Sequence, residues 1–320
     1  MRASFACLPR TVACAAALVM GMAVMPFANA GSLSPALIYG VTTTNDINLF
    51  DVQSQSFSFV ATSLSTGVKA NGFATDRIRN NLFYFGSNGD LYYYNTTSGG
   101  AGTVAPASTF GNSADFPPED ASFYNGAFWY IGKGDDFDNK LYQVPITYTG
   151  NVPSFSGTPT AYQLSASGST SGMGFGDIAI HRDTGILYGS TTPGSGGLFF
   201  TLDMNTLNPS ATNPVNVISS GNPISVQLAF SEDFSTLYGQ EYRVNSLDPT
   251  NPALTSGFWY SVDTTSGTYN SLSFATSPGM RDLGGVAAVP EPGTFLLATV
   301  GFAVALAWNR KPILKAARST

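Results

Sequence analysis

Short apolar segments recur along the chain, and each carries a tyrosine at or near its end. The tyrosines are Tyr39, Tyr84, Tyr130, Tyr188 and Tyr238, which are 45, 46, 58 and 50 residues apart. Glycine follows three of them directly and the other two at the second position. Self-similarity at a spacing of about 20 to 50 residues is typical of repeat architectures. Each segment is therefore expected to belong to one unit of a repeated fold.

Further strand-like segments flank each tyrosine segment. Upstream of four of them lies a strand of small and apolar residues, at 73–76, 122–125, 178–181 and 228–231. Downstream lies a strand that usually closes on Asp or Asn, at 48–51, 92–95, 142–145, 200–203 and 260–263. A turn then opens a weaker fourth strand, for example Tyr269–Phe274. Four short strands in a unit of about 45 to 60 residues are typical of a β-propeller blade.

The sequence therefore predicts an all-β fold, a β-propeller-like domain of about five blades at residues 31–288. The spans 100–118, 150–174 and 206–224 are rich in Pro, Gly, Ser, Thr and Asn, and they are long enough to hide a sixth blade. A two-layer β-sandwich is the alternative, because regularly spaced short strands occur in both architectures.

The first unit lacks its opening strand, and the missing strand is expected at the other end of the domain. There Asp282–Ala288 resembles Asp177–Ile180 and is followed by no tyrosine segment. Pairing of this strand with the blade that holds 36–41, 48–51 and 57–61 would close the ring. Closure would satisfy backbone groups that are otherwise unpaired at two sheet edges.

The predicted domain is acidic and contains no cysteine. Residues 31–292 hold all 20 acidic residues of the chain and only 8 basic ones, a net charge of −12. A nucleic-acid partner would require the opposite sign, so cations and neutral polymers are the expected partners. Both cysteines, Cys7 and Cys14, lie in the N-terminal segment. Disulfides and thiolate metal sites are therefore excluded from the domain.

Residues 1–30 have the organisation of a secretory signal peptide. Arg2 and Arg10 supply positive charge, residues 12–24 form an apolar run, and Ala28-Asn29-Ala30 has the form of a cleavage site. The sequence predicts export, with a mature chain that begins at Gly31.

Residues 289–320 show a second pattern in three parts. Pro290, Glu291 and Pro292 precede the mostly apolar run 294–308, and Arg310 and Lys311 open a basic tail. In order, spacing and position this segment resembles the PEP-CTERM sorting signal of Gram-negative bacteria. The resemblance covers about a tenth of the chain. It implies a membrane protease-transpeptidase of the exosortase type as partner, with processing near the Pro-Glu-Pro turn.

The run 294–308 is predicted to be a transmembrane helix. Its fifteen residues span about 22 Å at 1.5 Å each, less than a hydrocarbon core of about 30 Å. Trp308 and the basic side chains must cover the difference. The basic residues behind the run place the tail in the cytoplasm and the body in the periplasm. After processing, the resemblance implies a location at the cell surface or outside the cell.

His181 is the only histidine of the chain. A histidine zinc site needs two or three such ligands, so that chemistry is excluded. A Ser-His-Asp triad would have to combine His181 with Asp183 or Asp177, but no Gly-x-Ser-x-Gly segment accompanies it. We interpret His181 as a polar residue at the end of a strand.

The densest acidic group is Asp135, Asp136 and Asp138, in a predicted hairpin loop. Its oxygens suit Ca²⁺, which takes six to eight oxygen ligands. The spacing is not that of an EF-hand loop, because the Gly and the closing Glu are missing. A solvated loop is the interpretation we favour, so no cofactor is expected, and calcium at these three residues is the alternative.

Paired carboxylates for glycoside cleavage could come from Glu119, Asp120, Glu232 or Asp233. Runs of consecutive aromatic residues, at 92–94, 128–130 and 258–260, must point alternate rings to opposite sides of a sheet. Half of these rings are expected between blades, and the other half on a surface or against the next blade.

Two functions follow from these patterns. The first is an exported cell-surface or extracellular-matrix protein whose propeller is a non-catalytic binding or structural module. The resemblance places such a protein among extracellular polysaccharide, as in a biofilm matrix. The alternative is an extracellular glycan-active hydrolase or lyase, with carboxylates or His181 converging at the channel mouth. The absence of a recognisable catalytic motif favours the first, although propeller enzymes draw single residues from several blades.

Overall fold

The computed structural model of the protein describes residues 36–285, apart from short gaps at 43, 65–69, 111–119, 132–138, 167–174, 192–196, 222–223, 225, 244–255 and 277–278. The chain divides into Met1–Pro35 and Ala36–Thr320, and every described residue belongs to the second unit. The predicted signal peptide, sorting segment and transmembrane helix lie outside the described residues. Within the described ranges, no helix has the length and apolar character needed to span a membrane.

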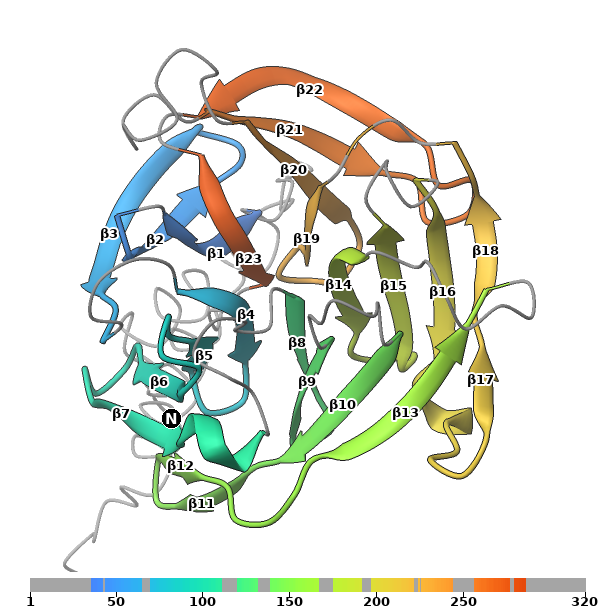
Figure 1. Ribbon diagram of the computed structural model, residues 1–320. Coiled ribbons are helices and arrows are strands. Elements are labelled where there is room, and N and C mark those ends of the chain that lie inside the picture. Colours follow the sequence, from blue (N-terminus) through green and yellow to red (C-terminus); the bar gives the residue numbers. More distant parts are fainter. Residues whose placement is uncertain are drawn as a thin grey trace, which may run out of the picture. The chain divides into compact units, whose positions relative to one another are not determined.

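The described residues form an all-β propeller of five blades, each a separate sheet whose four main strands are antiparallel (Figure 1). Blade A contains β23 (Met280–Gly285), β1 (Leu37–Thr42), β2 (Asp46–Asp51) and β3 (Ser56–Thr62). Blade B contains β4 (Asn71–Asp76), β5 (Asn81–Phe85), β6 (Leu91–Asn95) and β7 (Ala101–Ala105). Blade C contains β8 (Asp120–Tyr124), β9 (Ala127–Ile131), β10 (Lys140–Pro145) and β13 (Thr160–Ser165).

Blade D contains β14 (Phe175–His181), β15 (Ile186–Thr191), β16 (Phe199–Asp203) and β18 (Asn216–Ser219). Blade E contains β19 (Gln227–Phe230), β20 (Leu237–Arg243), β21 (Ser256–Val262) and β22 (Tyr269–Thr276). Two short 3-10 helices, η1 (Ala107–Thr109) and η3 (Met204–Thr206), lie in connections. The first strand of every blade is innermost, and β4, β8, β14, β19 and β23 contact one another in a closed ring around the axis. The predicted propeller is confirmed, and the alternative β-sandwich is wrong.

The predicted ring closure is confirmed as well. β23 pairs antiparallel with β1, placing Gly285 opposite Ile38 and Leu283 opposite Gly40. The closing strand begins two residues earlier than predicted, at Met280. Blade A is thus built from both ends of the described chain. The pairing satisfies backbone N–H and C=O groups that β1 and β23 would otherwise leave unpaired at their edges.

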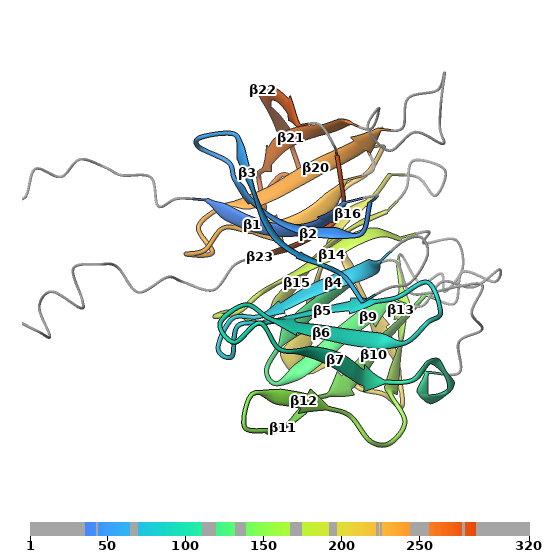
Figure 2. The same cartoon turned by 90° about the vertical axis from the view of Figure 1, so that its left-hand side faces the viewer.

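In the described residues, the long spans that could have held a sixth blade contain outer strands and one hairpin. β17 (Thr212–Pro214) pairs parallel with β13, so a segment between two strands of blade D extends blade C. The hairpin of β11 (Thr147–Thr149) and β12 (Val152–Ser154) follows β10. It lies along blade B, where the Phe155 amide donates to the Val104 carbonyl at 3.4 Å (Figure 2). These insertions tie neighbouring blades together.

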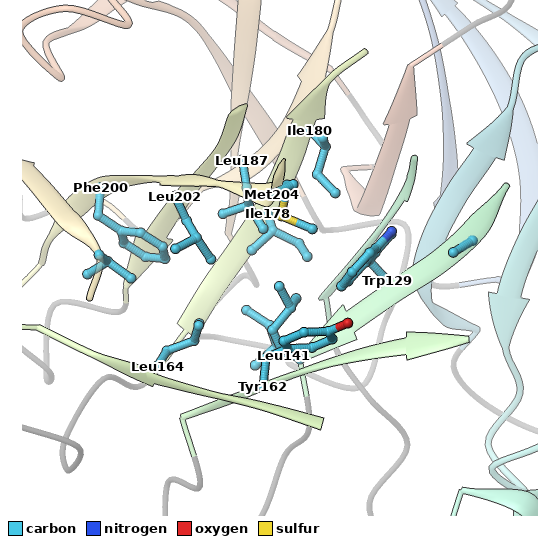
Figure 3. Close-up of a cluster of buried hydrophobic side chains, with 13 residues drawn as sticks. Trp129, Leu141, Tyr162, Leu164, Ile178, Ile180, Leu187, Phe200, Leu202 and Met204 are labelled. Carbon is cyan, nitrogen blue, oxygen red and sulfur yellow. The ribbon is translucent and has the colours of Figure 1, made fainter. Parts of the chain in front are cut away.

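The described hydrophobic core consists of five clusters, one between each pair of adjacent blades. The cluster between blades C and D packs Trp129 and Leu141 against Ile178 and Phe200 (Figure 3). The cluster between blades E and A packs Trp259 against Phe50, with ring centroids 4.6 Å apart. The other three lie between A and B, B and C, and D and E. The closing interface therefore has the same kind of core as the others.

Consecutive aromatic residues fill these clusters from both faces of a strand. Tyr93 of β6 points into the cluster between B and C, while Tyr92 and Tyr94 pack into the cluster between A and B. In β9, Phe128 joins the B–C cluster and Trp129 the C–D cluster. The predicted alternation is confirmed in these strands, and both sets of rings serve inter-blade packing because each inner sheet is covered on two sides.

Candidate functional site

The central channel is the candidate site, and small residues keep it open. At the same level of each inner strand lie Ala74, Ser122, Ala179, Ala229 and Gly284. Larger side chains would fill the axis, since five strands converge there. Toward the C-terminal ends of these strands the channel widens into a cavity of about 360 Å³. The two ends of the channel have opposite chemistry.

One end holds three buried carboxylates, Asp120, Asp177 and Asp282, at the start of β8, β14 and β23. They are only 4%, 0% and 0% exposed. Asp177 accepts from its own strand at the Ile178 amide (2.6 Å) and from β19 at the Leu228 amide (2.5 Å). Asp282 likewise accepts from Leu283 (2.7 Å) and, across the closure, from Phe73 of β4 (2.7 Å). Asp177 and Asp282 thus each join two inner strands.

β-Bulges help to aim these side chains. The register of β14 against β15 shifts between Phe175 and Asp177, and that of β23 against β1 shifts beside Asp282. β4 is bulged at the same level, between Asn71 and Ala74. An extra residue in one strand bends it and turns the next side chain. Here the bend brings carboxylates within reach of amides on the adjacent inner strand.

Burial raises the pKa of Asp177 well above its usual value, and repulsion from Asp282 and Asp120 raises it further. Burial and the charge of Asp120 do the same to the pKa of Asp282. Amide donors act in the opposite direction and are outweighed. Blade E has Gln227 at this level instead of a fourth carboxylate. With its amide nitrogen turned toward β23, Gln227 donates to Asp282 at 3.2 Å.

At the other end lies Arg77, which follows β4 and lines the cavity. Its guanidinium donates to the carbonyls of Phe230 (3.1 Å), Ser231 (3.1 Å) and Glu232 (3.0 Å) at the end of β19. It also stacks on the Phe234 ring, 4.0 Å from the centroid. Burial lowers the pKa of Arg77 to about 9, and the charge of Arg182 contributes to this shift. Arg77 therefore links blade B to blade E across the closing strand.

Gly285 makes this link possible. A Cβ at Gly285 would lie 1.8 Å from Nη2 of Arg77 and 2.7 Å from the Phe230 carbonyl oxygen. Only a residue without a side chain lets the guanidinium cross β23 and reach β19. Phe234, at φ 60°, lies in the left-handed region that is costly for a bulky residue. Its ring reaches Arg77 from that conformation.

His181 is the last residue of β14 and lies at the Arg77 end. Its Nδ1 accepts from the Thr184 amide at 3.4 Å. Its ring packs on Phe230 and Phe234, with centroids 5.1 and 5.3 Å apart. Of the two candidate triad partners, Asp177 lies at the opposite end of the strand, and Asp183 faces Arg182 at 4.0 Å. The described residues do not place His181 in a hydrogen-bonded triad with either.

Asp120 and Glu232, two of the candidate glycosidase carboxylates, are also separated. Asp120 lies at the start of the inner strand β8, and Glu232 lies just past the end of the inner strand β19. The two residues are therefore separated by about 15 Å along the strand direction. Glycosidases need about 5 to 9.5 Å between the two groups. Hydrogen bonds from Ser235 and Ser231 hold the pKa of Asp233 below its usual value, which opposes a role as acid. Glu119 lies outside the described residues.

The predicted calcium ligands Asp135, Asp136 and Asp138 also lie outside the described residues. Within the described ranges, no three His, Cys, Asp or Glu residues are placed to hold a metal ion. The buried carboxylates fit this finding, because amide donors occupy the oxygens of Asp177 and Asp282.

Sequence reasoning missed Thr75, Asp76 and Arg77, the polar residues of β4 and its turn that line the cavity. Nothing in their local pattern distinguishes them from other strand-end residues. The sequence did contain a signal for the grouping of Asp177 and Asp282. Each is followed by an apolar residue and then a small residue in an inner strand. Asp120 opens β8 in a similar way, with Ala121 and Ser122.

Residues 288–311 match the family model of the PEP-CTERM protein-sorting motif. This confirms the resemblance recognised at Pro290, Glu291 and Pro292, and the chain carries that sorting signal. No curated protein matches the chain. Among solved structures, the chain is similar to TolB from Acinetobacter baumannii at 13% identity and a TM-score of 0.42. The similarity covers 78% of this chain and 66% of that chain, just under two thirds of its length.

Proposed function

We propose that this chain, which carries a PEP-CTERM sorting signal, is displayed at the cell surface or released into the extracellular matrix, where its propeller binds polysaccharide without catalysis. The sorting signal implies an exported protein that an exosortase processes. The binding role of the propeller is supported by the charged side chains that line the channel.

The observation that carries this proposal is the state of the charged groups that line the cavity. Arg77 is engaged by three carbonyls. Asp76 accepts from Tyr148 and from the Ile78 amide. Groups committed to structural bonds are poorly suited to exchange protons with a substrate, while a rigid ring of this kind suits recognition.

Sorting leads to a first prediction. In a host with an exosortase, mass spectrometry of surface-extracted protein should find a chain that begins at Gly31 and lacks residues 294–320. The two terminal signals motivate this expectation. A Glu291→Ala variant should keep the tail, because the Pro-Glu-Pro turn is then altered. An intact tail on the wild-type chain in that host would contradict C-terminal processing.

The binding role leads to a second prediction. The purified full chain, applied to an array of extracellular polysaccharides, should be retained by at least one of them and leave its length unchanged. Reducing-end release should stay at the level of buffer alone, because backbone amides engage the buried carboxylates Asp177 and Asp282. Retention by none of the polymers would contradict the binding role. Shortened products would establish the hydrolase or lyase alternative.

A further inference from the structure

The channel cavity opens where the inner strands end. Its lining includes residues of the turns that follow these strands, namely Ile78 after β4, Asn125 after β8, Arg182 after β14 and Phe234 after β19. Ile78 is 72% exposed and the Arg182 side chain is 55% exposed, so both lie where the cavity meets solvent. This end, which is the one away from the three buried carboxylates, is the mouth of the cavity.

The closing strand ends at the same mouth. β23 runs from Met280 past the buried Asp282 to Gly285, and Gly285 lines the cavity. A Cβ at Gly285 would lie 1.8 Å from Arg77 Nη2, which places the strand end beside Arg77. β23 is also the innermost strand of blade A (Figure 1). The chain therefore leaves the described part of the domain at the mouth and close to the channel axis.

The predicted membrane anchor follows after a short link. The match to the sorting motif begins at residue 288, three residues beyond Gly285. The predicted transmembrane run begins at Thr294, nine residues beyond Gly285. Nine residues span at most about 30 Å, even when they are fully extended. The mouth of the anchored chain therefore lies within about 30 Å of the apolar core of the membrane.

A link of this length does not reach round to the opposite face of the propeller. Blade A has the strand order β23-β1-β2-β3, and neighbouring strands lie about 4.8 Å apart, so β3 is about 14 Å from β23. The seven residues of β3 add about 23 Å along the strand. A chain that passes round the outer edge of the blade needs both distances, which is more than the link can span. The predicted anchor therefore places the mouth, and not the carboxylate end, toward the membrane.

The charge of the domain opposes adhesion to the membrane once the link is cut. Residues 31–292 carry a net charge of −12, whereas anionic lipid attracts segments of positive charge. Covalent attachment is thus what keeps the mouth near the membrane. Cleavage near the Pro-Glu-Pro turn removes this attachment.

We propose that exosortase processing opens the channel cavity to macromolecules. In the unprocessed chain the link holds the mouth toward the membrane, and the bilayer obstructs the approach of a polysaccharide or a protein. After cleavage the mouth is free, so binding of an extracellular polymer in the channel begins only once the protein has been sorted. Small solutes reach the cavity in both forms. This inference rests on the proposed sorting and processing, and it assigns to processing the control of the proposed binding.

The test uses single cysteines, since both natural cysteines, Cys7 and Cys14, lie in the predicted signal peptide. Ile78→Cys marks the mouth. Ser220→Cys is the matched control, because Ser220 is exposed and follows β18 at the level of Asp177, on the opposite face. Labelling with a maleimide on a long polyethylene glycol chain reports access for a macromolecule, and labelling with a small maleimide corrects for the reactivity of each cysteine.

Spheroplasts of a host without an exosortase hold the anchored full chain, and the same host with an exosortase yields the processed chain. In the anchored chain the long reagent should label Ile78→Cys several-fold more slowly than Ser220→Cys, after correction by the small reagent. In the processed chain the two corrected rates should be equal. Arg182→Cys, at the mouth but in another blade, should behave as Ile78→Cys does, and it serves as the test if Ile78→Cys fails to fold.

A flexible spacer separates the effect of link length from that of attachment. About thirty Gly and Ser residues inserted between Ala287 and Ala288 add about 30 Å on average. The anchored chain with this spacer should label at Ile78→Cys as fast as the processed chain, although it remains in the membrane.

Equal corrected rates for Ile78→Cys and Ser220→Cys in the membrane-bound chain would overturn the inference. Slow labelling of the mouth that persists after processing, or with the spacer, would also overturn it. These outcomes leave the proposed sorting standing. A chain that does not fractionate with membranes in the exosortase-free host would overturn the anchoring itself, and with it both this inference and the proposed processing.

Discussion

Replacement of Asp282 with alanine is expected to lower the free energy of unfolding by about 3 kcal/mol, because the amides of Phe73 and Leu283 lose their acceptor inside the protein. Removal of a carboxylate that Asp120 repels offsets part of the cost. For a domain of this size the melting temperature should fall by about 6 to 12 °C. Thermal melts and urea titrations of the full chain measure it. The variant should also aggregate, since a loosened closing strand exposes two sheet edges.

Asp263→Ala is the matched control. Asp263 also accepts from local amides, those of Thr265 and Ser266, but in an exposed turn. Its loss should leave the melting temperature close to that of the wild type. Equal destabilisation by both variants would contradict a role for Asp282 in joining β23 to β4.

The pH dependence of stability tests the same residue. A carboxyl whose pKa is raised in the folded state binds protons there that the unfolded chain has released. Its contribution is complete below the unfolded pKa of about 3.9 and is lost as the pH rises through the raised folded pKa. Wild-type stability should therefore decline from about pH 4 upward, and less steeply in Asp282→Ala. A rise over this range would contradict the raised values.

Replacement of Gly285 with alanine is expected to lower the free energy of unfolding by about 2 kcal/mol, the usual cost of overpacking. The new methyl would lie 1.8 Å from Arg77 Nη2 and 2.7 Å from the Phe230 carbonyl oxygen. Because the carbonyl belongs to the backbone, the guanidinium must leave it or β23 must shift. Urea titration of the full chain measures the loss.

Gly239→Ala is the matched control for this prediction. It also adds a methyl in a buried strand, but its nearest atom would be 3.4 Å away, on Val226, an ordinary contact. Stability should change by less than about 0.5 kcal/mol. If the cost of Gly285→Ala disappears when Arg77→Met is also present, a double-mutant cycle assigns that cost to the Arg77 contact. Additive effects of the two substitutions would place it elsewhere.

The repeat in the sequence determined the five-bladed architecture, because the strands of each blade are specified by local sequence patterns. Alternation, turn residues and the recurring tyrosines, from Tyr39 to Tyr238, define the strands of each blade. The unmatched segment at Asp282 even indicated which strand closes the ring, since unpaired strand edges are costly wherever they occur. The terminal sorting motif was likewise readable, because it is a linear signal.

Only the tertiary structure decided what meets at the axis. Asp177 and Asp282 are 105 residues apart in the chain, and their shared environment with Asp120 arises because inner strands from three blades converge. The same convergence lets Arg77 cross Gly285 to reach Phe230. It also buries the Thr75 hydroxyl without a hydrogen-bond partner. A repeat specifies each blade separately, whereas contacts across the ring depend on how all five blades are placed around one axis, and no local pattern encodes that.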